Sequence, residues 1–159
     1  MRESTVAAPS ARIADEATSN DLLLEHQLCF ALSVAARSVV NSYRPVLQDL
    51  NLTHPQYLVM LALWERYPRT VRSLSDDLLM ESATLSPMLK RLETLGFVTR
   101  QRAEGDERAL AVSLTEAGMN LRERALSVPG TMMERLNLSR EQVNELNRAM
   151  RALIAATVS

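Results

Sequence analysis

One short part of this 159-residue chain departs from helical periodicity, and it limits the folds open to the rest. The runs FVTRQRA (97–103) and RALAVSLT (108–115) are short, contain β-branched residues, and flank the turn cluster EGDE with its Gly105. This pattern predicts a two-stranded hairpin. Because the sequence on both sides has helical spacing, we expect a mainly α fold with one small β-hairpin.

Helical spacing dominates the remaining sequence. Residues about 20–43 repeat apolar side chains at helical intervals, and Pro45 is expected to kink or restart this helix. Thr53 and Gln56 form a capping box that opens the next helix. The other expected helices are 70–80, 82–96, 115–128 (broken by Pro129–Gly130) and a terminal helix opened by a second capping box, Ser139 with Gln142.

Composition excludes several classes of protein. Aromatic residues make up only 4% of the chain, which favours helices over an all-β fold. Cys29 is the only cysteine, so no internal disulfide can form and a reducing, cytoplasmic location is expected. No window of 18 uncharged apolar residues is present, so we expect no membrane segment, and residues 1–19 have the composition of a flexible tail. With two histidines and no phosphate loop or metal-ligand cluster, we expect no metal, no cofactor and no enzymatic activity.

Positive charge gathers in one block of a nearly neutral chain. The net charge is −1, yet residues 82–103 hold Lys90, Arg91, Arg100 and Arg102 against one acid, Glu93. Helix, helix, short turn, helix and hairpin is the order of a winged helix-turn-helix, in which one helix enters the DNA major groove. Each charge alone is typical of a solvated surface, and it is their coincidence with the helix and hairpin that favours DNA binding.

The first and last helices suggest a second chain. Each has an apolar face too large to stand alone, so they either pack on the DNA-binding domain or pair between two subunits. Helix-turn-helix proteins commonly bind two-fold-related half-sites as dimers, which favours a homodimer on a pseudo-palindromic operator. The expected organisation is a tail (1–19), a winged helix-turn-helix (55–114), and a dimerisation region made from 20–54 and 115–159.

At this point the residues resemble a known family. HPQYLVMLALWE (54–65), LSPMLKRLETLGFVTRQRAEGDERALAVSLTEAG (85–118) and QLCFAL (27–32) together are similar to MarR-type repressors. The combination of QLCFAL with YRP (43–45) and PQYLVM (55–60) is more specific and resembles the organic-hydroperoxide regulators within that family. The resemblance covers most of the chain and implies a dimeric repressor that binds double-stranded operator DNA.

The resemblance also implies roles for residues of the DNA-binding domain. Arg108 matches the arginine at the tip of the wing, which reaches into the minor groove, and Asp106 matches the acid that braces it. Lys90, Arg91 and Arg100 match positions that contact phosphates. Ser82, Thr84 and Ser86 fall where the family meets bases and backbone.

Cys29 has two possible interpretations. A lone cysteine on an apolar helix face is usually a small apolar side chain, whereas a sensor needs thiolate character and access for an oxidant. In a helix beginning near residue 20, Cys29 lies about nine residues from the amino end, too far for the helix dipole to favour a thiolate. His26 either polarises the thiol or is an ordinary surface histidine.

Two more positions bear on that thiol. In the family resembled here, tyrosines hydrogen-bond the reactive cysteine, and Tyr43 matches one of them. Tyr43 lies about 21 Å from Cys29 along an ideal helix, so the resemblance implies that it reaches the cysteine of the partner subunit. His54 stands at the second tyrosine position and could donate a hydrogen bond, or become charged and make sensing pH-dependent.

The resemblance implies a redox switch. An organic hydroperoxide would oxidise Cys29 to a sulfenic acid, and a low-molecular-weight thiol would convert it to a mixed disulfide, with sulfenamide or overoxidation as other outcomes. The apolar neighbours of Cys29 favour organic hydroperoxides over hydrogen peroxide. Two alternatives remain: a MarR-type repressor released by a small lipophilic or phenolic ligand without cysteine chemistry, and, less favoured, a thiol peroxidase.

Overall fold

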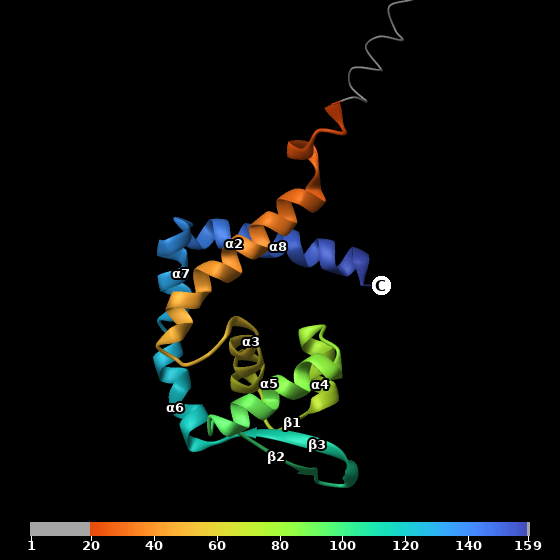
Figure 1. Cartoon of the computed structure of the whole chain (residues 1–159), viewed down its shortest axis with the longest axis vertical. Helices are drawn as coiled ribbons and strands as arrows, with labels where there is room; N and C mark the ends of the chain where they lie inside the picture. Colours follow the sequence, from red (N-terminus) through yellow and green to blue (C-terminus); the bar gives the residue numbers. More distant parts are fainter. Residues whose placement is uncertain (1–19, 159) are drawn as a thin grey trace, which may run out of the picture. The chain divides into compact units, whose positions relative to one another are not determined.

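The computed structural model describes residues 20–158, apart from the side chains of Ala103, Asp106 and Glu107 on the hairpin. The expected tail, 1–19, lies outside the described residues. The chain divides after Asn41 into two compact units. Figure 1 shows the elements in chain order.

The first unit contains a 3-10 turn, η1 (Leu24–His26), and most of helix α2 (Leu28–Gln48). The expectation of a helix from about residue 20 is therefore wrong. His26 Nδ1 donates to the carbonyl of Asn20 at 2.8 Å, and Gln27 Nε2 donates to that of Leu23 at 3.1 Å. These side chains occupy carbonyls that a continuous helix would use, and α2 begins only after the extended Gln27.

Pro45 was expected to kink or restart the helix, and the restart does not occur, because α2 continues past Pro45. It lies inside the helix, whose last residues, 42–48, belong to the second unit. A proline lacks the N–H that would bond the carbonyl four residues earlier, here that of Asn41. The two units therefore divide directly after Asn41, the residue whose carbonyl cannot accept a helical bond from Pro45.

The middle of the second unit is a lobe of three helices and a small sheet. Its elements are α3 (His54–Glu65), β1 (Arg69–Thr70), α4 (Val71–Leu78), α5 (Ser82–Thr94), β2 (Val98–Ala103) and β3 (Asp106–Leu114). The hairpin is confirmed, but the sheet has a third strand that the sequence did not reveal. β1 pairs antiparallel with β3, giving the order β1-β3-β2. Figure 1 shows the three helices on one side and β2 and β3 projecting as a hairpin.

The core of the lobe explains why these segments pack. Leu85, Leu89 and Leu92, spaced along one face of α5, are fully buried together with Leu63 of α3 and Leu74 of α4. Burying one such leucine contributes about 1.5–3 kcal/mol relative to leaving it exposed. The Thr53–Gln56 capping box is present at the start of α3. The apolar face of α5 therefore fixes which of its residues point outward.

Three helices complete the second unit: α6 (Glu116–Ala125), α7 (Val128–Leu136) and α8 (Arg140–Thr157). The expectation that Pro129–Gly130 breaks the helix is wrong, because both residues lie inside α7. The break falls at Leu126–Ser127, and Pro129 is the second residue of α7, where no helical N–H is needed. The Ser139–Gln142 capping box is confirmed at the start of α8.

Trp64 and Gly118 hold α6 against α3. The indole Nε1 of Trp64 donates to the carbonyl of Gly118 at 2.9 Å. A Cβ at Gly118 would lie 2.1 Å from the carbonyl oxygen of Phe97, so only glycine allows this approach. Within residues 20–158, no helix has the length and apolar character needed to cross a membrane.

Candidate functional site

Helix α5 presents the hydroxyls that the sequence singled out. Ser82, Thr84 and Ser86 are all exposed, opposite the buried leucines. Ser82 and Ser86 share a stripe with Lys90, because residues four apart lie on one face, while Thr84 lies on another part of the exposed arc. Ser86 Oγ donates to the Ser82 carbonyl at 2.8 Å, so its oxygen lone pairs remain available as acceptors.

The three cationic candidates have different surroundings. Lys90 and Arg91 are exposed. Arg100 is instead half-buried and paired with Glu93, a residue whose role the sequence did not suggest. Arg100 donates to Glu93 Oε2 through Nε at 3.0 Å and Nη2 at 2.7 Å, and its backbone N–H donates to Oε1 at 3.2 Å. A phosphate contact by Arg100 stays a prediction. The ion pair of Glu93 with Arg100 joins α5 to β2.

The carboxylate of Glu93 is held in its charged form. The side-chain hydrogen bonds from Arg100 keep the pKa of Glu93 below its usual value. A charge-assisted bond of this kind is stronger than a neutral one. At neutral pH the α5–β2 connection is therefore ionic as well as hydrogen-bonded.

The hairpin carries the remaining DNA-binding candidates. β2 and β3 are joined by Glu104 and Gly105, and Gly105 adopts φ +83°, the left-handed region that suits glycine. Arg108 lies exposed on β3, close to this turn. The side chain of Asp106 lies outside the described residues, so its expected bracing of Arg108 stays a prediction.

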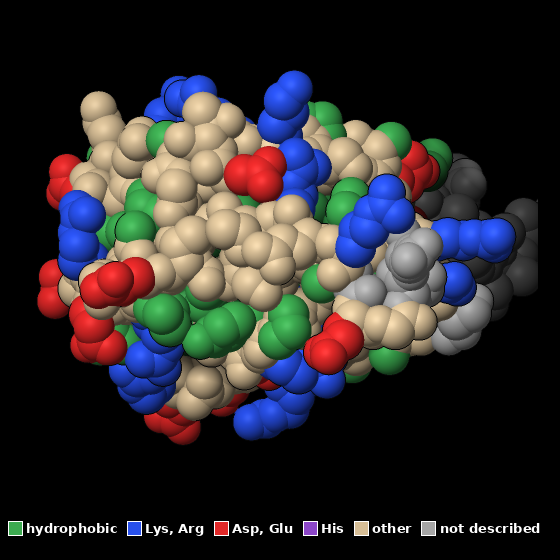
Figure 2. Space-filling model, turned by 90° about the horizontal axis from the view of Figure 1, so that it is seen from below, with side chains coloured by type: hydrophobic (Ala, Val, Ile, Leu, Met, Phe, Trp, Pro, Cys, Tyr) green, Lys and Arg blue, Asp and Glu red, His purple; other side chains and the backbone are tan. Residues whose placement is uncertain are grey.

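The charges on the hairpin side of the molecule are dispersed. Figure 2 shows this face, on which Lys and Arg side chains lie at several separate places with Asp and Glu among them. A basic block in the sequence thus does not become one continuous basic patch on this face. Recognition of DNA would depend on where individual cations stand, rather than on a uniform field.

Cys29 occupies a different position from the one expected. Because α2 begins at Leu28, Cys29 is the second residue of the helix and lies in its first turn. The backbone N–H groups of a first turn have no partners within the helix and carry a partial positive charge. The thiol is exposed in the chain, whereas His26 turns to the Asn20 carbonyl. The earlier objection that the dipole is too distant is wrong.

Tyr43 and His54 lie next to each other in the second unit. Their ring centroids are 5.1 Å apart, and the buried Tyr57 lies 6.0 Å from Tyr43. Burial lowers the pKa of His54 and raises that of Tyr43. Both rings are therefore neutral at neutral pH and able to donate hydrogen bonds. Among the described residues, no group of three His, Cys, Asp or Glu could hold a metal ion.

The sequence of this chain matches known families and relatives. Residues 41–124 match the family model described as the transcriptional regulator SarA/Rot. The chain is 44% identical over 131 residues to the organic hydroperoxide resistance transcriptional regulator of Bacillus subtilis (strain 168), covering 82% of this chain and 89% of that protein. The chain belongs to the MarR/SarA-type family of transcriptional regulators. The resemblance inferred from the sequence is thereby confirmed.

Solved structures support the winged-helix fold of this MarR-type regulator. One is the structure of reduced AbfR bound to DNA; AbfR is a protein of Staphylococcus epidermidis. It is 30% identical to this chain with a TM-score of 0.74, and the match covers 89% of this chain and 99% of that chain. The repressor CouR bound to a 23-mer DNA duplex is 24% identical with a TM-score of 0.72, covering 87% and 97%, and supports the fold alone. The lobe of α3–α5 with the β2–β3 wing is thus a winged helix-turn-helix, with α5 in the place of its second helix.

Proposed function

We propose that this regulator is a homodimeric repressor that leaves its operator when an organic hydroperoxide oxidises Cys29. The observation that carries the proposal is the place of Cys29, exposed and in the first turn of α2. The amino end of the helix, near which its Sγ lies, has backbone N–H groups without helical partners. The name of the Bacillus subtilis relative supports organic hydroperoxides as the signal.

The first chemical step is a two-electron oxidation of the thiolate. Cys29 Sγ attacks one peroxide oxygen, the O–O bond breaks, and the leaving alkoxide takes a proton to become an alcohol. The sulfur is oxidised to a sulfenic acid. A low-molecular-weight thiol then attacks this sulfur, forming a disulfide and releasing water. Because the chain contains no second cysteine, this thiol comes from outside the subunit.

Tyr43 and His54 supply hydrogen bonds to the thiolate in this proposal. They form one neighbouring pair, and they serve Cys29 of the partner subunit. The neutral imidazole of His54 takes the place of a second tyrosine as donor. An adduct at the thiol removes these bonds and displaces α2.

Unpartnered apolar side chains support the homodimer. In the first unit, α2 exposes Leu28, Phe30 and Val34. In the second unit, α8 exposes Leu146 and Ile154 and contains no buried residue. Helices that bury so little of their apolar side chains are typical of an interface between chains.

Operator recognition rests on the exposed arc of α5. Ser82, Thr84 and Ser86 meet bases and backbone, Lys90 and Arg91 meet phosphates, and Arg108 enters the minor groove beside them. Arg100 takes part through its bond to Glu93, which holds the wing against α5.

Operator release tests this function. Wild type should leave its operator after stoichiometric cumene hydroperoxide, and mass spectrometry should find one added oxygen or one thiol adduct on Cys29. Cys29→Ser should stay bound under the same treatment, with its reduced-state affinity unchanged. Equal release of both proteins would contradict the thiol switch.

The same experiment separates the alternatives. Release by a lipophilic phenol without any mass change would indicate a ligand-controlled repressor. We propose no enzymatic role, and the test is peroxide consumption with excess thiol. Turnover that continues well beyond one equivalent per Cys29 would instead establish a thiol peroxidase.

A further inference from the structure

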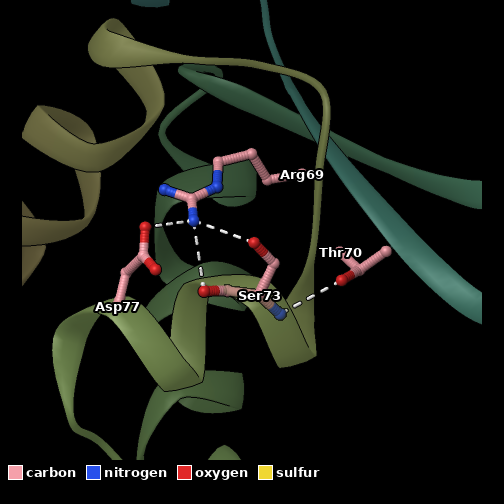
Figure 3. Close-up of polar contacts among 4 residues, drawn as sticks. All are labelled: Arg69, Thr70, Ser73 and Asp77. Carbon is pink, nitrogen blue, oxygen red and sulfur yellow. Dashed lines mark hydrogen bonds and ion pairs between the residues drawn. The ribbon is translucent and has the colours of Figure 1, made fainter.

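Arg69 is a buried arginine of strand β1, and its side chain contacts α4, the first helix of the helix-turn-helix. Its side chain is only 3% exposed. Nη2 donates to Ser73 Oγ at 2.8 Å, to the Ser73 carbonyl at 3.2 Å, and to Asp77 Oδ2. Figure 3 shows this nitrogen beside α4, with dashed lines to Ser73 and Asp77.

These contacts satisfy the guanidinium only in part. Arg69 Nε is buried and has no hydrogen-bond partner among the protein atoms that the structure describes. Asp77, the one carboxylate bonded to Arg69, is 55% exposed. Removing a charge from water costs roughly several kcal/mol per ion. Incomplete pairing offsets only a small part of this desolvation penalty. The arrangement is therefore a poor source of stability, and a well-packed apolar side chain would serve the core as well.

The same contacts determine where α4 lies. Arg69 belongs to β1 and pairs with Val112 of β3, so its backbone is fixed to the wing. The next residue, Thr70, caps α4 by accepting the N–H of Ser73 at 3.1 Å. The side chain of Arg69 then bonds the first turn through Ser73 and the second turn through Asp77. Two turns of α4 are thus set against the wing sheet.

Helix α4 passes this placement on to α5. Ser75 of α4 donates its hydroxyl to the Met80 carbonyl in the turn between the helices. Its oxygen also lies 3.4 Å from the hydroxyl oxygen of Ser82, the first residue of α5. A chain of contacts therefore runs from β3 through Arg69 and α4 to the amino end of α5.

We propose that Arg69 is a positioning residue for sequence-specific DNA recognition. It sets the amino-terminal turn of α5 in register with the wing, so that both reach their grooves together. The inference rests on the DNA contacts of α5 in the proposed function. Base contacts require placement within about 0.5 Å, whereas phosphate contacts carry no sequence information directly. Loss of Arg69 should therefore reduce specificity while leaving general DNA affinity intact.

The test replaces Arg69 with an apolar side chain of similar length. Arg69→Met should keep the melting temperature of wild type yet raise the Kd by about tenfold, the value of one base contact, for a duplex that wild type selects from a random pool. Affinity for poly(dI-dC) should not change. Arg122→Met is the matched control, because Arg122 is 53% exposed on α6, and it should behave as wild type. Wild-type affinity for the selected duplex, or an equal loss on both DNAs, would overturn the proposal.

Two further measurements cover the other outcomes. If Arg69→Met does not fold, Arg69→Met with Asp77→Leu removes both charges. That variant should fold and bind the selected duplex weakly, and failure to fold or full affinity would overturn the proposal. If wild type selects no duplex, the proposed function fails, and hydrogen exchange still decides the positioning role. Arg69→Met should then speed exchange of the α4 amides, and unchanged protection would count against it.

Discussion

Glu93 and Arg100 join helix α5 to strand β2 through one carboxylate that accepts three hydrogen bonds. The acid comes from the last turn of α5 and the base from the third residue of β2. The wing and helix α5 are thereby tied by an ionic contact as well as by apolar packing. Arg100 serves both elements at once, which accounts for its half-buried position.

Glu93→Gln should weaken this connection in a pH-dependent way. Arg100 lowers the pKa of Glu93 from its ordinary 4.5. In the folded chain Glu93 thus stays ionised to lower pH than in the unfolded chain, so its contribution is complete above pH 4.5 and is lost as pH falls through the folded pKa. Thermal unfolding should show a lower melting temperature for Glu93→Gln at pH 7 and convergence with wild type in acid. A constant difference across pH would contradict the ionic contact.

His54 should make the stability of the chain sensitive to mild acid. Burial lowers the pKa of His54 from 6.5, so the unfolded chain binds a proton before the folded chain does. Stability should therefore fall as pH decreases from 6.5 towards the folded pKa. Melting curves between pH 7.5 and 5.5 measure this slope. His54→Gln, which cannot titrate, should have a shallower slope, and identical slopes would show that His54 is not the group responsible.

Arg108→Ala should weaken operator binding and flatten its salt dependence. Each phosphate neutralised by a cation contributes about 0.9 to the slope of log K against log salt concentration. We expect the slope to fall by about one such contact. Titrations at several salt concentrations test this, with Arg122→Met as the control. An unchanged slope would remove Arg108 from the phosphate and groove contacts.

Gly118→Ala should destabilise the second unit. The added Cβ would lie 2.1 Å from the backbone oxygen of Phe97, and a backbone atom cannot turn aside as a side chain does. Overpacking of this kind typically costs about 1–3 kcal/mol. Gly130→Ala is the matched control, because no atom lies within 4 Å of its added Cβ and α7 is helical there. Denaturant melts should show a loss for Gly118→Ala and none for Gly130→Ala.

Local signals predicted most of the lobe, and the start of α8, correctly. The hairpin, helix α5 starting at Ser82, and both capping boxes follow from neighbouring residues, and all are present. β1 could not be recognised because it has two residues and forms only through pairing with β3, more than forty positions away. Its Arg69 was overlooked for the same reason, since nothing local shows that an arginine will be buried.

Errors in the sequence interpretation had more than one cause, and the first is side chains that compete with backbone bonds. Gln27 and His26 delay the start of α2 by bonding carbonyls nearby, and this moves Cys29 into the first turn. Pro129 was expected to break a helix, yet it stands where a helix can begin. The proximity of Tyr43 and His54 depends on how α3 folds back beside the end of α2, which only the structure reveals.

Trp64 gives this protein a built-in spectroscopic reporter. It is the only tryptophan of the chain, so the indole emission has a single source. Its ring lies 6.4 Å from Tyr57, which adjoins Tyr43, and its Nε1 is bonded to Gly118. Emission wavelength and quenching therefore report on the α3–α6 junction and on the tyrosine–histidine cluster together. Unfolding, effector response and the variants above can all be followed by fluorescence without attaching a label.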